Sequence, residues 1–70
     1  MKLVHKDSEV EVQDGETVTD FRGDASIVVS REEPRHSGST GRVYVKPADP
    51  ADGAWTQGYY PSVFDLKWID

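Results

Sequence analysis

The stretch Gly41-Arg42-Val43-Tyr44-Val45-Lys46 decides the fold class, because its side chains alternate between polar and apolar types. A period of two places Val43 and Val45 on one face of an extended chain, which is typical of a half-buried β-strand. The whole chain agrees with this pattern, since its 70 residues include nine Val and only two Leu. Stiff β-branched side chains favour pleated sheets over helices. The sequence therefore predicts an all-β protein.

Upstream of this stretch, the sequence predicts a hairpin. The segment Asp7-Ser8-Glu9-Val10-Glu11-Val12-Gln13 alternates, which indicates a strand with Val10 and Val12 turned inward. Asp14-Gly15 then offers the positive φ of a tight turn, and residues 17–21 resume an extended pattern. We expect the two segments to pair with each other.

The remaining segments complete a set of five or six short antiparallel strands. Ala25-Ser26-Ile27-Val28-Val29-Ser30-Arg31 predicts a central strand covered on both faces. Short closing strands are expected at residues 57–60 and 66–69, separated by one 3₁₀ turn that begins at Pro61 and ends at Phe64. Residues rich in Pro and Gly at 32–40 and 47–54 predict loops without helix or sheet. The pattern predicts a single domain over residues 1–70, either a small barrel or a two-sheet sandwich, and the length of the chain favours the barrel.

The segment Gly58-Tyr59-Tyr60-Pro61-Ser62-Val63-Phe64-Asp65-Leu66 resembles the closing segment of SH3 domains. In that family a glycine and aromatic strand precedes a Pro-Ser 3₁₀ turn, an aromatic residue and a last short strand. The resemblance implies an SH3-like barrel, in which Pro61 and Phe64 would help to form a shallow groove for proline-rich ligands. The chain lacks the family's N-terminal Ala-Leu-Tyr-Asp-Tyr signature, and Tyr44 stands in place of its paired Trp. The resemblance therefore implies the architecture more than the ligand.

Composition excludes several classes of protein. The absence of Cys excludes disulfides and cysteine-ligated zinc. No apolar run approaches the roughly 18 residues of a membrane span, and Met1-Lys2-Leu3-Val4-His5 lacks the apolar stretch of a secretion signal. We therefore expect a cytoplasmic protein without a membrane partner. The chain as a whole resembles the short acidic proteins that phages of high-GC bacteria encode in accessory regions.

Charge is distributed unevenly along the chain. Residues 31–46 carry four basic and two acidic side chains, a net +2, while the rest of the chain carries −7. One hypothesis is contact with nucleic acid, with Tyr44 stacking on a base. Its basic residues are Arg31, Arg35, Arg42 and Lys46. An isoelectric point of about 4.8 disfavours it, because the acidic remainder repels phosphates. The opposite hypothesis is that the acidic surface imitates DNA and inhibits a nucleic-acid-binding protein.

The polar motifs predict no catalytic residue, metal or cofactor. His36 stands beside hydroxyl side chains in Ser37-Gly38-Ser39-Thr40-Gly41, but a nucleophile and base also need a third group that orients the base. The same segment offers backbone N–H groups to an anion, but it lacks the lysine and the following helix of a phosphate loop, so an ordinary hairpin loop is the better interpretation. Asp7, Glu9 and Glu11 share one face of the expected strand and therefore do not wrap a cation.

Aromatic side chains are dense near the C-terminus. Alternation places Tyr59 and Tyr60 on opposite faces, so at least one of them should be exposed beside Pro61. Exposed aromatic residues often anchor protein contacts. The sequence therefore predicts a non-catalytic protein-interaction or inhibitor module, as a monomer or weak homo-oligomer. Its expected contact residues are Tyr44, Tyr59, Tyr60, Pro61 and Phe64.

Overall fold

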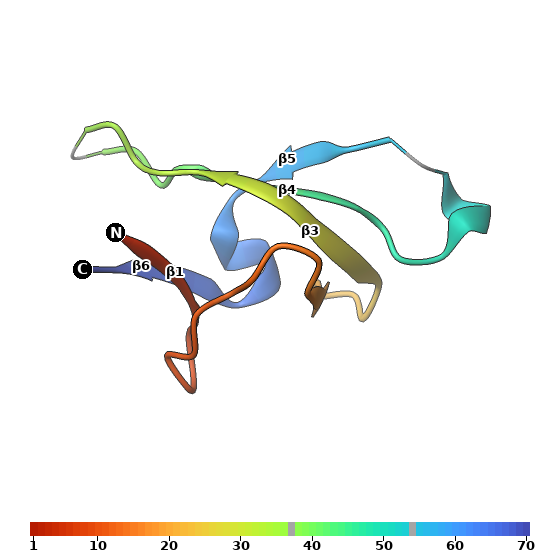
Figure 1. The fold of residues 1–70 in the computed structure, drawn as a ribbon, viewed down its shortest axis with the longest axis horizontal. Coiled ribbons are helices and arrows are strands. Elements are labelled where there is room, and N and C mark those ends of the chain that lie inside the picture. The colour runs from red at the N-terminus through yellow and green to blue at the C-terminus, as the bar shows by residue number, and fades with distance from the viewer. Residues whose placement is uncertain (37, 54) are drawn as a thin grey trace.

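Strands make up most of the regular structure of this protein. The computed structural model describes residues 1–36, 38–53 and 55–70, so Ser37 and Ala54, which belong to the two expected loops, lie outside the described residues. The described residues form no α-helix, which confirms the all-β prediction. The elements in chain order are β1 Lys2–His5, β2 Thr17–Thr19, β3 Ala25–Glu32, β4 Arg42–Pro47, η1 Pro50–Asp52, β5 Gln57–Tyr59, η2 Pro61–Phe64 and β6 Leu66–Ile69, with η denoting a 3₁₀ turn (Figure 1).

The strands form two antiparallel sheets and, within the described residues, do not close into a barrel. β2, β3, β4 and β5 form a four-stranded sheet in that order, and β1 pairs with β6. Figure 1 shows η2 between the two sheets. Asp65, which follows η2, adopts a left-handed conformation with φ +58°, and its N–H bonds back to Pro61 and Ser62. This tight turn redirects the chain, so that β6 pairs with β1 and leaves β5 at a sheet edge.

β3 and β4 form the longest pairing of the fold. Val28 pairs with Val45, and Val43 and Val45 are buried as predicted. The register shifts between Val28 and Ser30, so Val29 has no partner in this register. The expectation that both faces of β3 are covered is wrong, because Val29 is 40% exposed. β3 lies inside the sheet, but the second sheet covers only one of its faces.

The predicted hairpin of residues 7–13 with residues 17–21 is not formed. The N–H of Glu9 bonds to the carbonyl of His5 at 2.8 Å, and Glu9 adopts φ +58°. This turn interrupts the period of two, so Val12 is buried whereas Val10 is 59% exposed. β2 pairs with β3 instead, in the register that joins Thr17 to Ile27.

The connection after β4 also differs from expectation. Pro47 ends β4, and η1 is a 3₁₀ turn where no helical structure was expected. Asp49 caps this turn by accepting a hydrogen bond from the N–H of Ala51 at 2.9 Å, and Pro at the first helical position favours such a turn. Local capping chemistry therefore organises a segment whose composition suggests only a loop.

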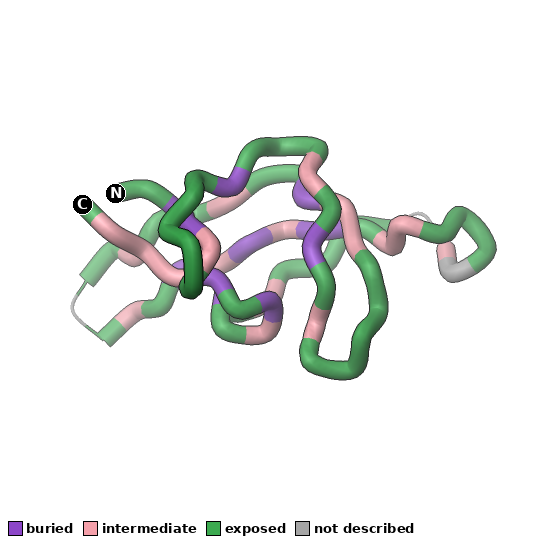
Figure 2. The backbone as a smooth tube through the Cα atoms, turned by 90° about the horizontal axis from the view of Figure 1, so that it is seen from below, coloured by how far each residue is buried: buried purple, intermediate pink, exposed green. Residues whose placement is uncertain are grey.

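The hydrophobic core lies between the two sheets. In Figure 2 the buried positions lie along the middle of the molecule, and the loops are exposed. Each fully buried aliphatic or aromatic side chain contributes about 1.5–3 kcal/mol to folding. The buried hydrophobic residues are Leu3, Val4, Val12, Val18, Val28, Val43, Val45, Phe64 and Leu66.

Candidate binding groove

The expected aromatic patch is divided between the core and the surface. Phe64 is only 5% exposed, and Pro61 is buried beside it in η2. The Tyr59 ring packs edge-on against Phe64 with 5.6 Å between ring centroids and an interplanar angle of 88°, the geometry that aromatic quadrupoles favour. These side chains therefore support the fold beneath the surface and offer little area to a partner.

Tyr60 is the exposed member of the set, and Tyr44 is half-buried. Tyr60 is 53% exposed, and the Arg42 guanidinium lies 4.3 Å from its ring centroid. Tyr44 is half-buried against β5, where a Cβ on Gly58 would lie 2.8 Å from the Tyr44 ring. The sequence prediction that one of the two adjacent tyrosines is exposed is confirmed, and the exposed one is Tyr60.

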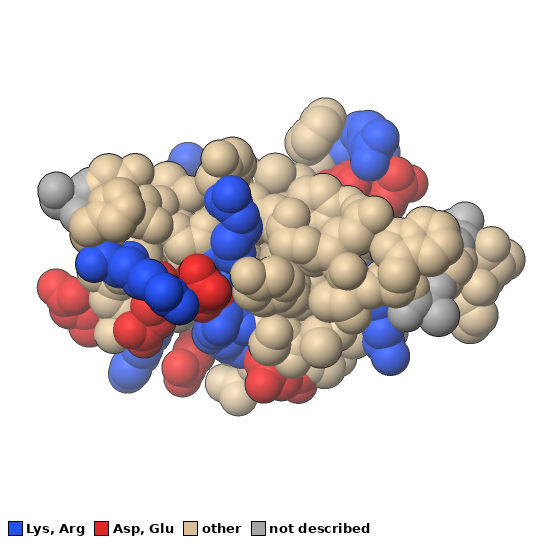
Figure 3. Space-filling model, turned by 90° about the horizontal axis from the view of Figure 1, so that it is seen from above, with Lys and Arg blue, Asp and Glu red and all other residues tan. Residues whose placement is uncertain are grey.

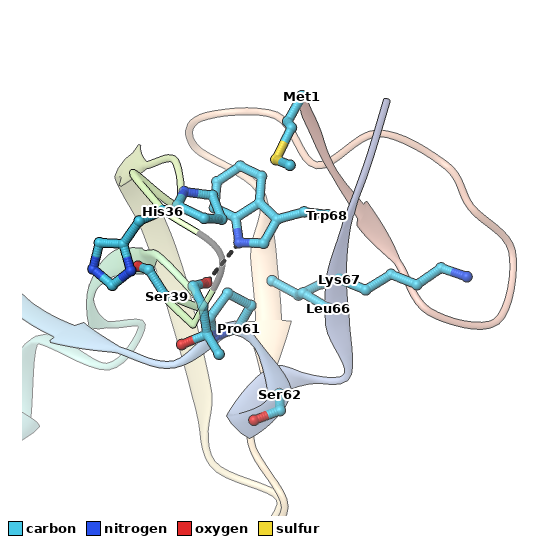
Figure 4. A pocket seen from close by; sticks show the side chains of 10 residues that line it. Met1, His36, Ser39, Pro61, Ser62, Leu66, Lys67 and Trp68 are labelled. Atoms are coloured by element: carbon cyan, nitrogen blue, oxygen red, sulfur yellow. Dashed lines mark hydrogen bonds between the residues drawn. The ribbon is translucent and has the colours of Figure 1, made fainter.

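An open hollow of about 450 Å³ lies between the β3–β4 loop, η2 and β6. Trp68 of β6 is half-buried in it, and its indole N–H donates to the Thr40 carbonyl at 2.7 Å. This hydrogen bond fixes the indole against the loop (Figure 4). The apolar residues that line this hollow, called here the Trp68 hollow, are Met1, Pro34, Pro61, Leu66 and Trp68.

A second open hollow of about 390 Å³ continues from the first toward the start of β4. Arg42 and Tyr60 line it together with three hydroxyl residues, and we call it the Arg42 hollow. His36, Ser39, Thr40 and Ser62 line both hollows. The two hollows therefore adjoin, and together we call them the groove, apolar at Trp68 and polar at Arg42.

Gly41 shapes the wall of this groove, and the sequence reasoning did not identify it. It is buried with φ +66°, in the left-handed region that favours glycine. A Cβ at this position would overlap the Glu32 carbonyl oxygen and lie 3.0 Å from Cζ2 of Trp68. The chain can therefore return from the loop into β4 beside the indole only because residue 41 has no side chain.

Trp68 belongs to the aromatic-rich C-terminal segment, but the sequence alone did not identify it as a residue of this groove. The loop residue that accepts the indole hydrogen bond is 28 positions away in the chain. No local sequence pattern around Trp68 therefore indicates this contact. A single sequence does not show which distant segments lie side by side in the fold, so it does not relate Thr40 to Trp68.

The four basic residues of segment 31–46 do not form one surface. Arg31 turns toward the N-terminal segment and donates to the Val12 carbonyl at 2.6 Å and to Asp14 at 2.7 Å. Arg35 pairs with Glu32 at 3.8 Å, Arg42 lies on Tyr60, and Lys46 is exposed further along β4. Figure 3 shows Lys and Arg side chains spread over this side of the molecule, several of them next to Asp or Glu.

The positively charged groups at the edge of the Trp68 hollow are also paired with carboxylates. The Lys67 ammonium points away from the hollow (Figure 4) and lies 2.8 Å from Glu9. This hydrogen bond and the Lys67 charge lower the pKa of the Glu9 carboxyl below its usual range. The amino group of Met1 lies 3.4 Å from Glu33.

The described residues contain no group of three or more His, Asp or Glu side chains placed to hold a metal ion. His36 lines the groove beside Ser39, but Ser37, the other adjacent hydroxyl, lies outside the described residues. Nor do Asp7, Glu9 and Glu11 share a strand face, because the chain turns at Glu9.

No protein family, curated protein or solved structure matched this chain in the comparisons with known proteins. The SH3 resemblance therefore stays an expectation from nine residues. Among the described residues, no helix has the length and apolar character needed to cross a membrane.

Proposed function

We propose that this chain is a non-catalytic module that binds a protein partner, and that the groove from Trp68 to Arg42 is its contact site. The observation that carries the proposal is the open, apolar Trp68 hollow, which continues to the exposed Tyr60. Trp, Tyr and Arg are the residue types that most often dominate the energy of protein interfaces. All three line this one groove.

The packing around the groove also supports this proposal. The Trp68 indole is held by the Thr40 carbonyl, and η2 is anchored by the buried Pro61 and Phe64. A rigid surface loses little conformational entropy when a partner binds, which favours affinity. The groove is therefore pre-formed on the side that β6 and η2 provide.

A protein partner agrees with this arrangement better than nucleic acid does. A strand of nucleic acid needs several cations that follow its phosphates. Arg31 and Arg35 are each paired with a carboxylate of the chain itself, and the net charge is −5. A groove with one apolar and one polar end suits an amphipathic peptide segment.

The proposal is tested by selecting random peptides on the purified protein and measuring their affinity for a variant with a filled groove. Ser62 is exposed and lines both hollows, so Ser62→Tyr adds bulk in the groove without entering the core. Phe21→Ala is the matched control, because Phe21 is an 81% exposed aromatic residue outside the groove. We expect selected peptides to bind wild type and Phe21→Ala alike and to lose at least about tenfold in affinity, about 1.4 kcal/mol, on Ser62→Tyr. Equal affinity for all three proteins, or no selected peptide, would contradict the proposal.

A further inference from the structure

Among the described residues, Arg42 differs from the other three arginines in having no carboxylate partner. Arg22 pairs with Asp20 and Asp24, Arg31 with Asp14, and Arg35 with Glu32. Within residues 1–36, 38–53 and 55–70, no Asp or Glu oxygen lies within 4.0 Å of the Arg42 guanidinium. The chain has 13 acidic residues, yet the Arg42 guanidinium remains accessible to a carboxylate of another molecule.

Tyr60 orients the Arg42 guanidinium, and no described residue accepts a hydrogen bond from its N–H groups. The Arg42 Cζ lies over the Tyr60 ring at 4.3 Å from its centroid, and this cation–π contact uses the face of the aromatic ring, which is not a carboxylate acceptor. A guanidinium presents its N–H donors as a fork that matches a carboxylate. Arg42 is half-buried in the sheet, so less freedom is lost when it binds an anion than for a fully exposed side chain.

The rest of the groove agrees with an anionic ligand. No Asp or Glu is among the described residues that line either hollow. Beside Arg42, Ser39, Thr40 and Ser62 bring hydroxyl groups to the polar end, and His36 brings an imidazole. The Ser39 oxygen accepts the Gly41 N–H at 3.2 Å, so its own hydrogen remains available as a donor.

We propose that the groove binds a short acidic segment of a partner protein, with an Asp or Glu carboxylate on Arg42 and a neighbouring bulky apolar side chain in the Trp68 hollow. This inference rests on the proposed function and names the chemistry of the partner. The net charge of −5 repels long acidic tracts. We therefore expect a segment with a single carboxylate next to an apolar residue. Charge complementarity then selects this partner over neutral or basic peptides.

The test uses fluorescein-labelled Gly-Ser heptapeptides that contain one Trp and one Glu at varied spacing, each with a twin in which Gln replaces Glu. Dissociation constants come from fluorescence anisotropy, and NMR follows the Arg42 Nε and Trp68 Nε1 signals. A hydrogen bond to a charged group is worth about 1.5–3 kcal/mol, so the Glu peptide of the best spacing should bind at least about tenfold more tightly than its Gln twin.

Substitutions at position 42 test whether Arg42 causes the preference for the Glu peptide over its Gln twin. Arg42→Gln should abolish the difference between the twins, and Arg42→Lys should retain part of it, because Lys keeps the charge and lacks the fork. Arg35→Gln makes the same charge change outside the groove and should leave the preference intact. Unperturbed Trp68 Nε1 signals in the unbound variants report that the groove is still formed.

The outcomes separate the two proposals. Equal binding of both twins in the groove, or a preference that survives Arg42→Gln, would overturn the acidic segment and leave the proposed function standing. Displacement of the Glu peptide by equimolar oligothymidylate would also overturn it, in favour of a phosphate ligand. If neither these heptapeptides nor any selected random peptide binds, the proposed function itself fails.

Discussion

A methyl group at position 41 would press on the Trp68 indole beside the groove, which makes Gly41→Ala an informative perturbation. The residue has φ +66°, and a left-handed conformation costs an L-residue other than glycine about 1–2 kcal/mol. The added Cβ also overlaps the Glu32 carbonyl oxygen and lies 3.0 Å from Trp68 Cζ2 and 3.1 Å from the Pro34 nitrogen. Overpacking of this kind costs about 1–3 kcal/mol more. We expect a total destabilisation of about 2–5 kcal/mol.

Gly23→Ala is the matched control, because it separates the backbone cost from the steric cost. Gly23 also has a positive φ, +89°, but a Cβ there meets nothing within 4 Å. We therefore expect it to lose only the backbone contribution of about 1–2 kcal/mol. Urea unfolding followed by circular dichroism measures both variants against wild type.

Thermal unfolding gives a second reading of the same difference. For a domain of this size, 1 kcal/mol corresponds to about 4–8 °C in Tm, so Gly41→Ala should melt several degrees below Gly23→Ala. The Trp68 Nε1 signal should also move in Gly41→Ala alone, since the new methyl group contacts the indole. Equal destabilisation by the two substitutions, with an unchanged indole signal, would refute the reasoning that the wall of the groove depends on glycine.

Three further substitutions test the packing and the charges. Phe64→Ala should be among the most destabilising single changes, by about 3–5 kcal/mol, because Phe64 is buried in the core; a loss below about 1 kcal/mol in urea unfolding would place it outside the core. Arg31→Met should cost about 1–3 kcal/mol through the lost bond to the Val12 carbonyl at 2.6 Å, and an unchanged unfolding midpoint would show that this bond contributes nothing. Burial acts to raise the pKa of Glu16, but hydrogen bonds from His5 and the Gln13 N–H, with nearby positive charge, lower it overall below 4.5. The folded state therefore binds this proton less readily than the unfolded state, and the stabilisation is complete above about pH 4.5 and is lost as the pH falls through the lowered pKa. Glu16→Gln should flatten the acid side of the stability curve, and an identical acid profile in wild type and variant would contradict this assignment.

Local patterns in the sequence were sufficient wherever neighbouring residues decide the conformation. The alternation in residues 41–46 predicts β4 with Val43 and Val45 inward, because the period of two is a property of any extended chain. Pro61 predicts η2, since its fixed φ suits a first helical position. The all-β class follows from the same local preferences, which act before any distant contact forms.

Only the tertiary structure decided which segments pair and which side chains reach the surface. The turn at Glu9 cancels the alternation that predicts a strand at residues 7–13, and the turn at Asp65 sends β6 to β1 instead of closing a barrel. The same packing buries Phe64, exposes Tyr60 and leaves Arg42 without a carboxylate partner among the described residues. These outcomes depend on contacts between residues far apart in the chain, and a residue's type does not specify which distant partner will reach it. The sequence by itself therefore determined β2 to β6 and the 3₁₀ turn at Pro61 but not β1, and the packing of the two sheets determined the groove.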